Sequence, residues 1–240
     1  MWVQDFRGPA GTPPDPAVWA HEVGGGGWGD GQLQVYTDDP ANAALDGAGH
    51  LAITARREAD GTITSARLTT QGRFATSYGR VEARIKVPGG VGTWPAFWML
   101  GVDIDDVGWP ACGEIDVMEH VGADPRRCHG TAHGPGWSGL GGGIGAAVDA
   151  GVDLAEDFHD YAVAWDESSV TWFLDGRAYH RLTPADVPGA WPLDRELFLV
   201  LNLAIGGDWP GNATDVPALP AVLLVDRLVV GQADTGLSQS

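Results

Sequence analysis

Apolar and polar residues alternate with a period of two along much of the chain, and turn-forming residues separate the alternating runs. The clearest run is Arg-Val-Glu-Ala-Arg-Ile-Lys-Val at residues 80–87, which stops at Pro88-Gly89-Gly90. Successive side chains of a strand point to opposite faces, so this period predicts strands with one buried face. Further segments of the same type are residues 32–36, 50–54, 63–68, 161–165, 170–174, 178–182, 197–204 and 221–230.

Helical patterns are rare in this sequence. Thr183-Pro184-Ala185-Asp186 has the residues of a helix start, enough for one short turn. Many strands, few helices and no break in composition indicate one all-β domain, a β-sandwich or jelly roll, in a chain of 240 residues. The glycine-rich segments 24–27 and 139–145 predict loops. We expect the domain to span residues 1–231 and residues 232–240 to form a solvated C-terminal tail.

One predicted strand carries three carboxylates, in Gly-Glu-Ile-Asp-Val-Met-Glu-His at residues 113–120. Glu114 and Asp116 share a face, whereas Glu119 would point to the opposite face of a regular strand. A one-residue bulge at Val117-Met118 would return Glu119 to their face, and bulges are common beside active sites. The Cα atoms of Glu114 and Glu119 would then stand ~13 Å apart, at ~3.3 Å per residue. Their side chains can close most of that gap, toward the ~5–5.5 Å between the carboxyl groups of a retaining glycosidase.

Two other interpretations of the acidic strand remain open from its residues alone. Acidic residues alternating with apolar ones usually form a solvated strand face, although like charges lined up on one face repel one another. The carboxylates, with His120 and His133, also supply metal-ligand atoms, but the helical His-Glu-x-x-His spacing is absent from the sequence.

The charge balance narrows the range of partners. The chain has 14 Lys and Arg against 32 Asp and Glu, a formal net charge of -18. A surface this acidic repels nucleic acid and anionic lipid, so we expect neither a nucleic-acid nor a membrane partner. The apolar runs near residues 94–100 and 197–205 are too short to cross a bilayer. Cys112 and Cys128 are equally compatible with a disulfide and with two buried thiols.

Tryptophan is unusually frequent, with 11 residues, more than a core needs. Flat aromatic faces that stack on sugar rings would account for the excess. Trp94 and Trp98 share a strand face, although two tryptophans on one strand more often belong to the core. Trp109, just before Pro110, precedes the acidic strand, and His133 and Trp209 lie in glycine-rich loops where a core role is less natural.

Together these motifs resemble glycoside hydrolase family 16, and within it the bacterial laminarinases, which are endo-β-1,3-glucanases. The likeness rests on residues 114–119, on Trp-Pro-Ala-Phe-Trp at 94–98 and on His-Gly-Pro-Gly at 133–136, and it extends over nearly the whole chain. It implies a jelly roll of two curved antiparallel sheets with a sugar-binding cleft on the concave face. It also implies a retaining endo-hydrolase of laminarin-type β-glucans, with mixed-linkage β-1,3-1,4-glucans as further substrates.

The resemblance assigns roles to individual residues. Glu114 matches the nucleophile, Glu119 the acid/base and Asp116 the residue between them. The candidate substrate-binding residues are Trp94, Trp98, Trp109, His133, Trp209, Asn42 and Arg84. Catalysis of this kind requires no cofactor. Because three carboxyls crowd together, at least one pKa should be raised, and we expect it to be that of Glu119.

Many members of this family bind a structural calcium ion on the convex side. Gly49 and Asp226 match plausible ligand positions, and Asp5 is the third candidate. The chain departs from the family here, because it has Gln4-Asp5-Phe6 where relatives often have Asp-Glu-Phe. We expect a secreted, extracellular monomer, although no signal peptide is present in this sequence.

Two rival functions remain from the sequence. A family relative can act on another polysaccharide, such as lichenan or agar, and a non-catalytic β-glucan-binding lectin can share the fold. The intact pair of Glu114 and Glu119 favours the enzyme, because a binding protein needs no matched acid and nucleophile.

Overall fold

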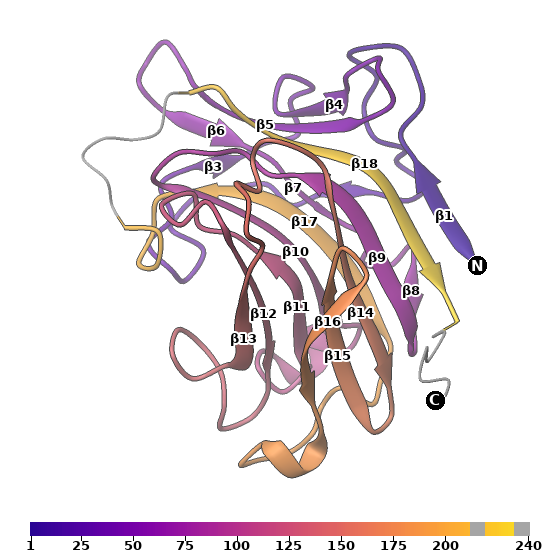
Figure 1. Cartoon of the computed structure of the whole chain (residues 1–240). Coiled ribbons are helices and arrows are strands. Elements are labelled where there is room, and N and C mark those ends of the chain that lie inside the picture. The colour runs from indigo at the N-terminus through magenta and orange to yellow at the C-terminus, as the bar shows by residue number, and fades with distance from the viewer. Residues whose placement is uncertain (212–218, 233–240) are drawn as a thin grey trace.

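The computed structural model describes residues 1–211 and 219–232, and in this part of the chain two curved, mostly antiparallel sheets pack against each other (Figure 1). The expected all-β jelly roll is confirmed. Of the expected tail at residues 232–240, all but Gln232 lie outside the described residues. Neither helix in the described part of the chain has the length or the apolar character needed to cross a membrane.

The larger sheet contains ten described strands in the hydrogen-bonded order β16-β15-β14-β9-β18-β5-β6-β3, with β1 beside β18 and β4 beside β5. Its strands are β1 Trp2–Asp5, β3 Val35–Tyr36, β4 Ala43–Leu45, β5 Leu51–Arg57, β6 Ile63–Ser65, β9 Gly79–Lys86, β14 His159–Asp166, β15 Ser169–Leu174, β16 Arg177–Leu182 and β18 Ala221–Gly231.

The smaller sheet contains eight described strands in the order β13-β12-β11-β10-β17-β7-β2, with β8 beside β17. Its strands are β2 Ala20–His21, β7 Arg67–Thr69, β8 Ala75–Thr76, β10 Thr93–Gly101, β11 Glu114–Glu119, β12 Arg127–His133, β13 Ile144–Asp149 and β17 Leu197–Ile205. The two short helices are α1 Ile104–Val107 and η1 Pro184–Asp186.

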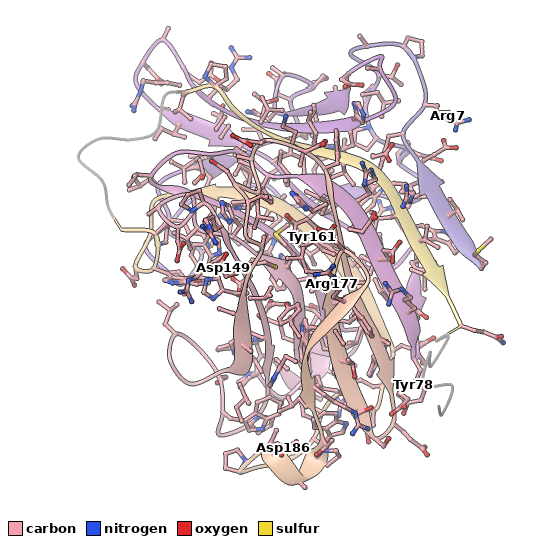
Figure 2. All side chains as sticks on the ribbon, viewed as in Figure 1. Arg7, Tyr78, Asp149, Tyr161, Arg177 and Asp186 are labelled. Atoms are coloured by element: carbon pink, nitrogen blue, oxygen red, sulfur yellow. The ribbon has the colours of Figure 1, made fainter. Side chains whose placement is uncertain are left out.

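The core lies between the two sheets, because the period-two pattern of each strand turns its apolar residues inward. Val81, Ala83 and Ile85 of β9 face it from the larger sheet, and Ile115 and Met118 of β11 face it from the smaller one. Tyr161 of β14 is buried in this interior, whereas Asp186 lies exposed at the η1 turn (Figure 2). The outer face of the smaller sheet is therefore available for a cleft.

Most of the predicted strands are confirmed to within three residues at either end, but two are arranged differently. The predicted strand at residues 63–68 is two strands, because the chain crosses from the larger to the smaller sheet at the buried Ala66. The Ser65 hydroxyl donates a 2.7 Å hydrogen bond to the Leu203 carbonyl at this crossing. Of residues 32–36, only Val35 and Tyr36 form a strand, since the amide of Gln32 turns back to bond the Gly27 carbonyl.

Smaller features follow the local sequence. The short turn predicted at residues 183–186 is confirmed as η1, and Asp186 accepts hydrogen bonds from the backbone amide and the hydroxyl of Thr183. The glycine-rich segment 139–145 is a loop as expected, except that β13 already begins at Ile144. Cys112 and Cys128 are both buried free thiols, which decides between the two alternatives that the sequence leaves open.

Candidate active site

A β-bulge in β11 is confirmed at the expected position. On the β10 side, Trp98 faces Asp116 and its neighbour Phe97 faces Met118, so Val117 is the extra residue. On the β12 side, Asp116 faces Thr131 and Glu119 faces His129, with Gly130 alone opposite the bulge. The extra residue restores the phase of the strand, and Glu114, Asp116 and Glu119 all line one cleft.

The cleft runs across the outer face of the smaller sheet and has a volume of about 1150 Å³. Side chains of β7, β10, β11, β12, β13 and β17 form its floor, and loops contribute Trp28, Trp109, Leu140 and Trp209 to its walls. The acidic strand is therefore the floor of a cleft rather than an ordinary solvated face.

Glu119 is held by the neighbouring strand. The indole Nε1 of Trp94 donates a 3.0 Å hydrogen bond to Glu119 Oε1. Burial raises the pKa of Glu119 well above its usual range, and the negative charges of Asp116 and Glu114 raise it further. A carboxyl with a raised pKa keeps its proton near neutral pH, as a general acid requires.

Glu114 and Asp116 form a hydrogen-bonded carboxyl pair. Burial raises the pKa of Glu114 to about 8 and that of Asp116 to about 7. The sequence singles out Glu119, but all three carboxyls have raised pKa values because all three are removed from water. His133 and a 2.8 Å hydrogen bond from Trp109 Nε1 oppose the shift at Glu114 and favour its ionised form.

His133 lies beside this pair, with its Nε2 3.1 Å from Asp116 Oδ2 and 3.7 Å from Glu114 Oε1. Possible metal-ligand atoms of Glu114, Asp116 and His133 lie within 4.8 Å of one another. For these three residues the geometry agrees with the metal-site interpretation. His120 is not in this group. It is fully buried, and its Nδ1 bonds the Arg127 carbonyl at 2.8 Å.

The four candidate tryptophans all line the cleft, but they differ in exposure. Trp109 is 48% exposed and Trp94 only 7%, while Trp98 and Trp209 are half-buried. Trp209 packs edge-on against Trp94, with ring centroids 5.5 Å apart, and against His129 at 4.8 Å. The predicted aromatic lining is thus present, and Trp94 has its edge directed at a carboxyl.

The structure adds cleft residues that the sequence did not single out. Arg67 lies over the rings of Trp28 and Trp98, at 4.8 and 4.6 Å from their centroids. Asn202 accepts a 2.7 Å hydrogen bond from Trp98 Nε1. One signal was available: Asn202 is the single polar residue in the nine-residue apolar strand β17. Other added lining residues are Asp30, Gln32, His129, Thr131 and Asp208.

The assignment of Asn42 to substrate binding is wrong. Its side chain is 2% exposed and does not line the cleft. The amide nitrogen donates to the Thr54 carbonyl at 2.8 Å and to Thr64 Oγ1 at 3.1 Å, and the amide oxygen accepts from Thr37 at 2.6 Å. Through these bonds the Asn42 amide connects neighbouring segments of the larger sheet. The side chain of Asn42 therefore has no role in contact with sugar.

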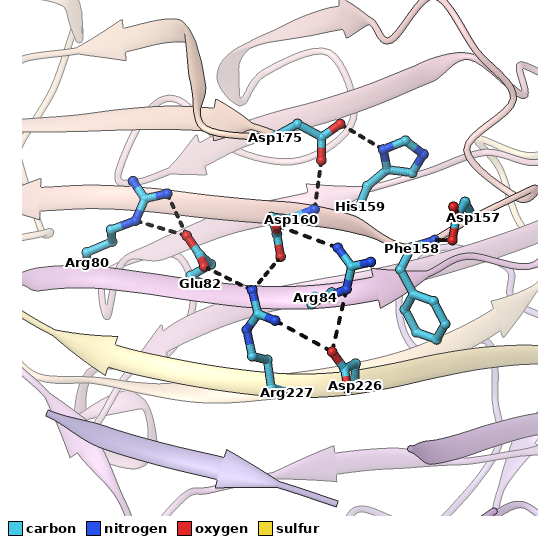
Figure 3. Close-up of polar contacts among 10 residues, drawn as sticks. All are labelled: Arg80, Glu82, Arg84, Asp157, Phe158, His159, Asp160, Asp175, Asp226 and Arg227. Atoms are coloured by element: carbon cyan, nitrogen blue, oxygen red, sulfur yellow. Dashed lines mark hydrogen bonds and ion pairs between the residues drawn. The ribbon is translucent and has the colours of Figure 1, made fainter. Parts of the chain in front are cut away.

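The assignment of Arg84 is also wrong. Since Val81, Ala83 and Ile85 of β9 face the core, Arg84 faces the outer side of the larger sheet, away from the cleft. Figure 3 shows its guanidinium between two carboxylates, with Nη1 3.7 Å from Asp160 and Nε 3.5 Å from Asp226.

The three candidate calcium ligands do lie together. Asp5, Gly49 and Asp226 line one hollow of about 590 Å³ beside β1 and β18. Two carboxylates and a backbone carbonyl are hard oxygen donors of the kind that calcium prefers, but they are fewer than its usual six to eight ligands. Asp226 is also paired with Arg84 and Arg227, and both arginines would compete with an ion.

Comparisons with known proteins agree with this geometry. The profile of Glycosyl hydrolases family 16 matches residues 30–217. A beta-glucanase of Rhodothermus marinus is 42% identical over 229 residues, which are 90% of this chain and 80% of that protein. The catalytic domain of an endo-1,3-beta-glucanase (laminarinase) from Thermotoga petrophila RKU-1 superimposes with a TM-score of 0.89 at 43% identity, covering 98% of this chain and 97% of that one.

Some relatives are much longer than this chain. The clotting factor G alpha subunit of Tachypleus tridentatus is 38% identical over 97% of this chain, but the match spans 34% of that protein. The family profile covers more than half of the chain and includes the bulged acidic strand. The chain therefore belongs to glycosyl hydrolases family 16.

Proposed function

We propose that this protein is a retaining endo-β-1,3-glucanase that hydrolyses laminarin-type β-glucans and also mixed-linkage β-1,3-1,4-glucans. The observation that carries the proposal is the bulge in β11, which brings Glu114, Asp116 and Glu119 onto the floor of one aromatic-lined cleft. The names of the relatives in the comparisons support the same substrate class.

In the proposed mechanism, protonated Glu119 donates its proton to the glycosidic oxygen while Glu114 attacks the anomeric carbon. The bond to the leaving sugar breaks and a glycosyl ester of Glu114 forms. Glu119, now a carboxylate, removes a proton from water, which attacks the same carbon and releases Glu114. One proton held between Glu114 and Asp116 leaves this pair one negative charge for the attack. The chemistry needs no cofactor.

A product profile on three polysaccharides tests the proposal. Laminarin should give a ladder of oligosaccharides early in the reaction, because an endo-enzyme cuts within the chain. Lichenan should be cut as well, whereas agarose should not be cut. Absence of new reducing ends from laminarin, with binding retained, would instead favour the non-catalytic lectin, and agarose cleavage would favour the other family specificities.

We also propose a structural calcium ion in the hollow lined by Asp5, Gly49 and Asp226. Oxygen donors from these residues would hold it, and water would complete its coordination. The ion would tie β1 to β18 at the edge of the larger sheet, so its effect would be on stability and not on the reaction.

Residues 1–231 would act as one catalytic domain of a secreted, monomeric protein that meets its polysaccharide outside the cell. The acidity of the chain supports the absence of nucleic-acid and membrane partners. Analytical ultracentrifugation tests the monomer, and a second species at micromolar concentration would contradict it.

A further inference from the structure

The bulge in β11 is bonded from the opposite sheet. The indole Nε1 of Trp172, on β15, donates a 2.8 Å hydrogen bond to the backbone carbonyl of Asp116. Trp172 is fully buried, and its bond crosses the core from the larger sheet to the smaller one. The carbonyl that it holds belongs to the peptide between Asp116 and Val117, where the bulge begins.

Gly130 leaves the space that Trp172 occupies. It is the single residue of β12 opposite Val117 and Met118. A Cβ atom at Gly130 would lie 2.3 Å from Trp172 Cδ1 and 2.4 Å from the Tyr179 hydroxyl. Both distances are far shorter than a van der Waals contact, so the indole reaches the bulge only because residue 130 has no side chain.

This bond acts on the part of β11 where the phase of the strand changes. Without the extra residue, Glu119 would face the core, since a shift of one residue turns a side chain to the other face of a sheet. The carbonyl of Asp116 is the last backbone acceptor before the register shift of the bulge. The side chain of Asp116 pairs with Glu114.

We propose that Trp172 is a positioning residue for the catalytic carboxylates: its indole N–H fixes the Asp116 peptide and thereby holds Glu119 on the cleft face beside Glu114 and Asp116. The role rests on the proposed function, because it acts through those three carboxyls. Trp172 itself does not line the cleft.

The test compares Trp172→Phe with Trp165→Phe. Trp165 is a matched control because it is also buried, lies on the adjacent strand β14 and donates from its indole to a backbone carbonyl, that of Leu193 at 2.7 Å. Leu193 lies outside β11 and outside the cleft lining. Both changes remove one indole N–H and leave an aromatic ring, so their effects on stability should be similar.

We expect Trp172→Phe to lower kcat on laminarin by about tenfold or more with KM within about twofold, because small displacements of catalytic groups affect turnover strongly. The basic limb of the kcat profile should also move to lower pH, since a looser bulge admits water to Glu119. Trp165→Phe should keep the wild-type kcat and pH profile. If Trp172→Phe does not fold, 3-benzothienylalanine at position 172 keeps the bicyclic ring and removes only the N–H.

Wild-type kcat and pH profile in a folded Trp172 variant would overturn the inference, as would equal losses of kcat in both variants. A wild-type protein that does not cut laminarin would refute the proposed function instead. The positioning role is then judged by amide hydrogen exchange at Val117 and Met118. Exchange should be faster in Trp172→Phe than in wild type and Trp165→Phe, and equal rates in all three would contradict it.

Discussion

The indole nitrogen of Trp94 lies 3.0 Å from Oε1 of Glu119, across the pair of strands β10 and β11. Trp94 is almost fully buried, and the edge of its ring points at the carboxyl. This geometry suits the orientation of Glu119 better than stacking on a sugar. The half-buried Trp98 and Trp209 have more ring surface free for that purpose.

Replacement of Trp209 by Ala should weaken binding of a laminari-oligosaccharide by about 1–3 kcal/mol, the range known for ring stacking on nucleic-acid bases. Calorimetry on a Glu119→Gln background keeps the sugar uncut during the measurement. Trp2, which stacks on Phe74 outside the cleft, provides the control Trp2→Ala. Equal affinities of the Trp209 and Trp2 variants would show that Trp209 is no platform.

Glu114→Gln and Glu119→Gln should each lower kcat by at least about a hundredfold while the protein stays folded, because each loses an acid, base or nucleophile. The double variant should be little worse than either single one, since residues that act as a unit are not additive. Glu82→Gln, on the outer face of β9, is the matched control and should retain activity. Near-normal turnover in either single variant would contradict the assignment.

Stability should depend on pH through the buried carboxyls. Burial raises the pKa of Glu114 from its usual 4.5 to about 8. The folded state then binds more protons than the unfolded state between these values, so stability is full below about pH 4.5 and falls as pH rises to about 8. Glu114→Gln stays neutral and avoids this loss.

Urea unfolding at pH 4.5 and at pH 8 measures the effect. The free energy of unfolding of Glu114→Gln relative to wild type should rise over this range by up to about 5 kcal/mol, at about 1.4 kcal/mol per pKa unit. Glu167→Gln, in the exposed turn after β14, is the control. A Glu114→Gln difference that is the same at both pH values would rule out a buried, protonated Glu114.

Calcium should raise the melting temperature if the hollow at Asp226 binds it. An ion that binds only the folded state at 100 times its dissociation constant adds about 2.7 kcal/mol to stability, which for a chain of this size corresponds to several degrees. Asp226→Asn should abolish the shift. Identical melting curves with chelator and with added calcium would show that no calcium ion stabilises this fold.

The pattern of the chain predicts the two-sheet architecture and the bulged acidic strand, because both depend on the order of residues within short segments. Period-two alternation decides which face of a strand is buried, and the odd spacing of Glu119 from Glu114 and Asp116 already requires a bulge. The tryptophans of the cleft could be identified because they border the acidic strand in sequence.

The remaining features depend on contacts between distant segments. The prediction that Asn42 and Arg84 lie in the cleft is wrong because the local sequence pattern does not determine to which sheet a residue belongs. Arg67 was missed because it joins the cleft only after the chain changes sheets at Ala66. Trp172 is 56 residues from Asp116, whose backbone carbonyl accepts its hydrogen bond. Every residue has such a carbonyl, so the sequence does not single out this partner.

The measurement that tests the central claim most directly is early-time NMR of laminarin cleavage. In the proposed mechanism the carboxyls of Glu114 and Glu119 are close enough for direct attack, without the water that an inverting enzyme holds between groups ~6.5–9.5 Å apart. The β-anomer should therefore form first and the α-anomer only later, by mutarotation, and deletion of Met118 should abolish the reaction because it removes the bulge. Initial formation of the α-anomer, or cleavage by the deletion variant, would contradict the account.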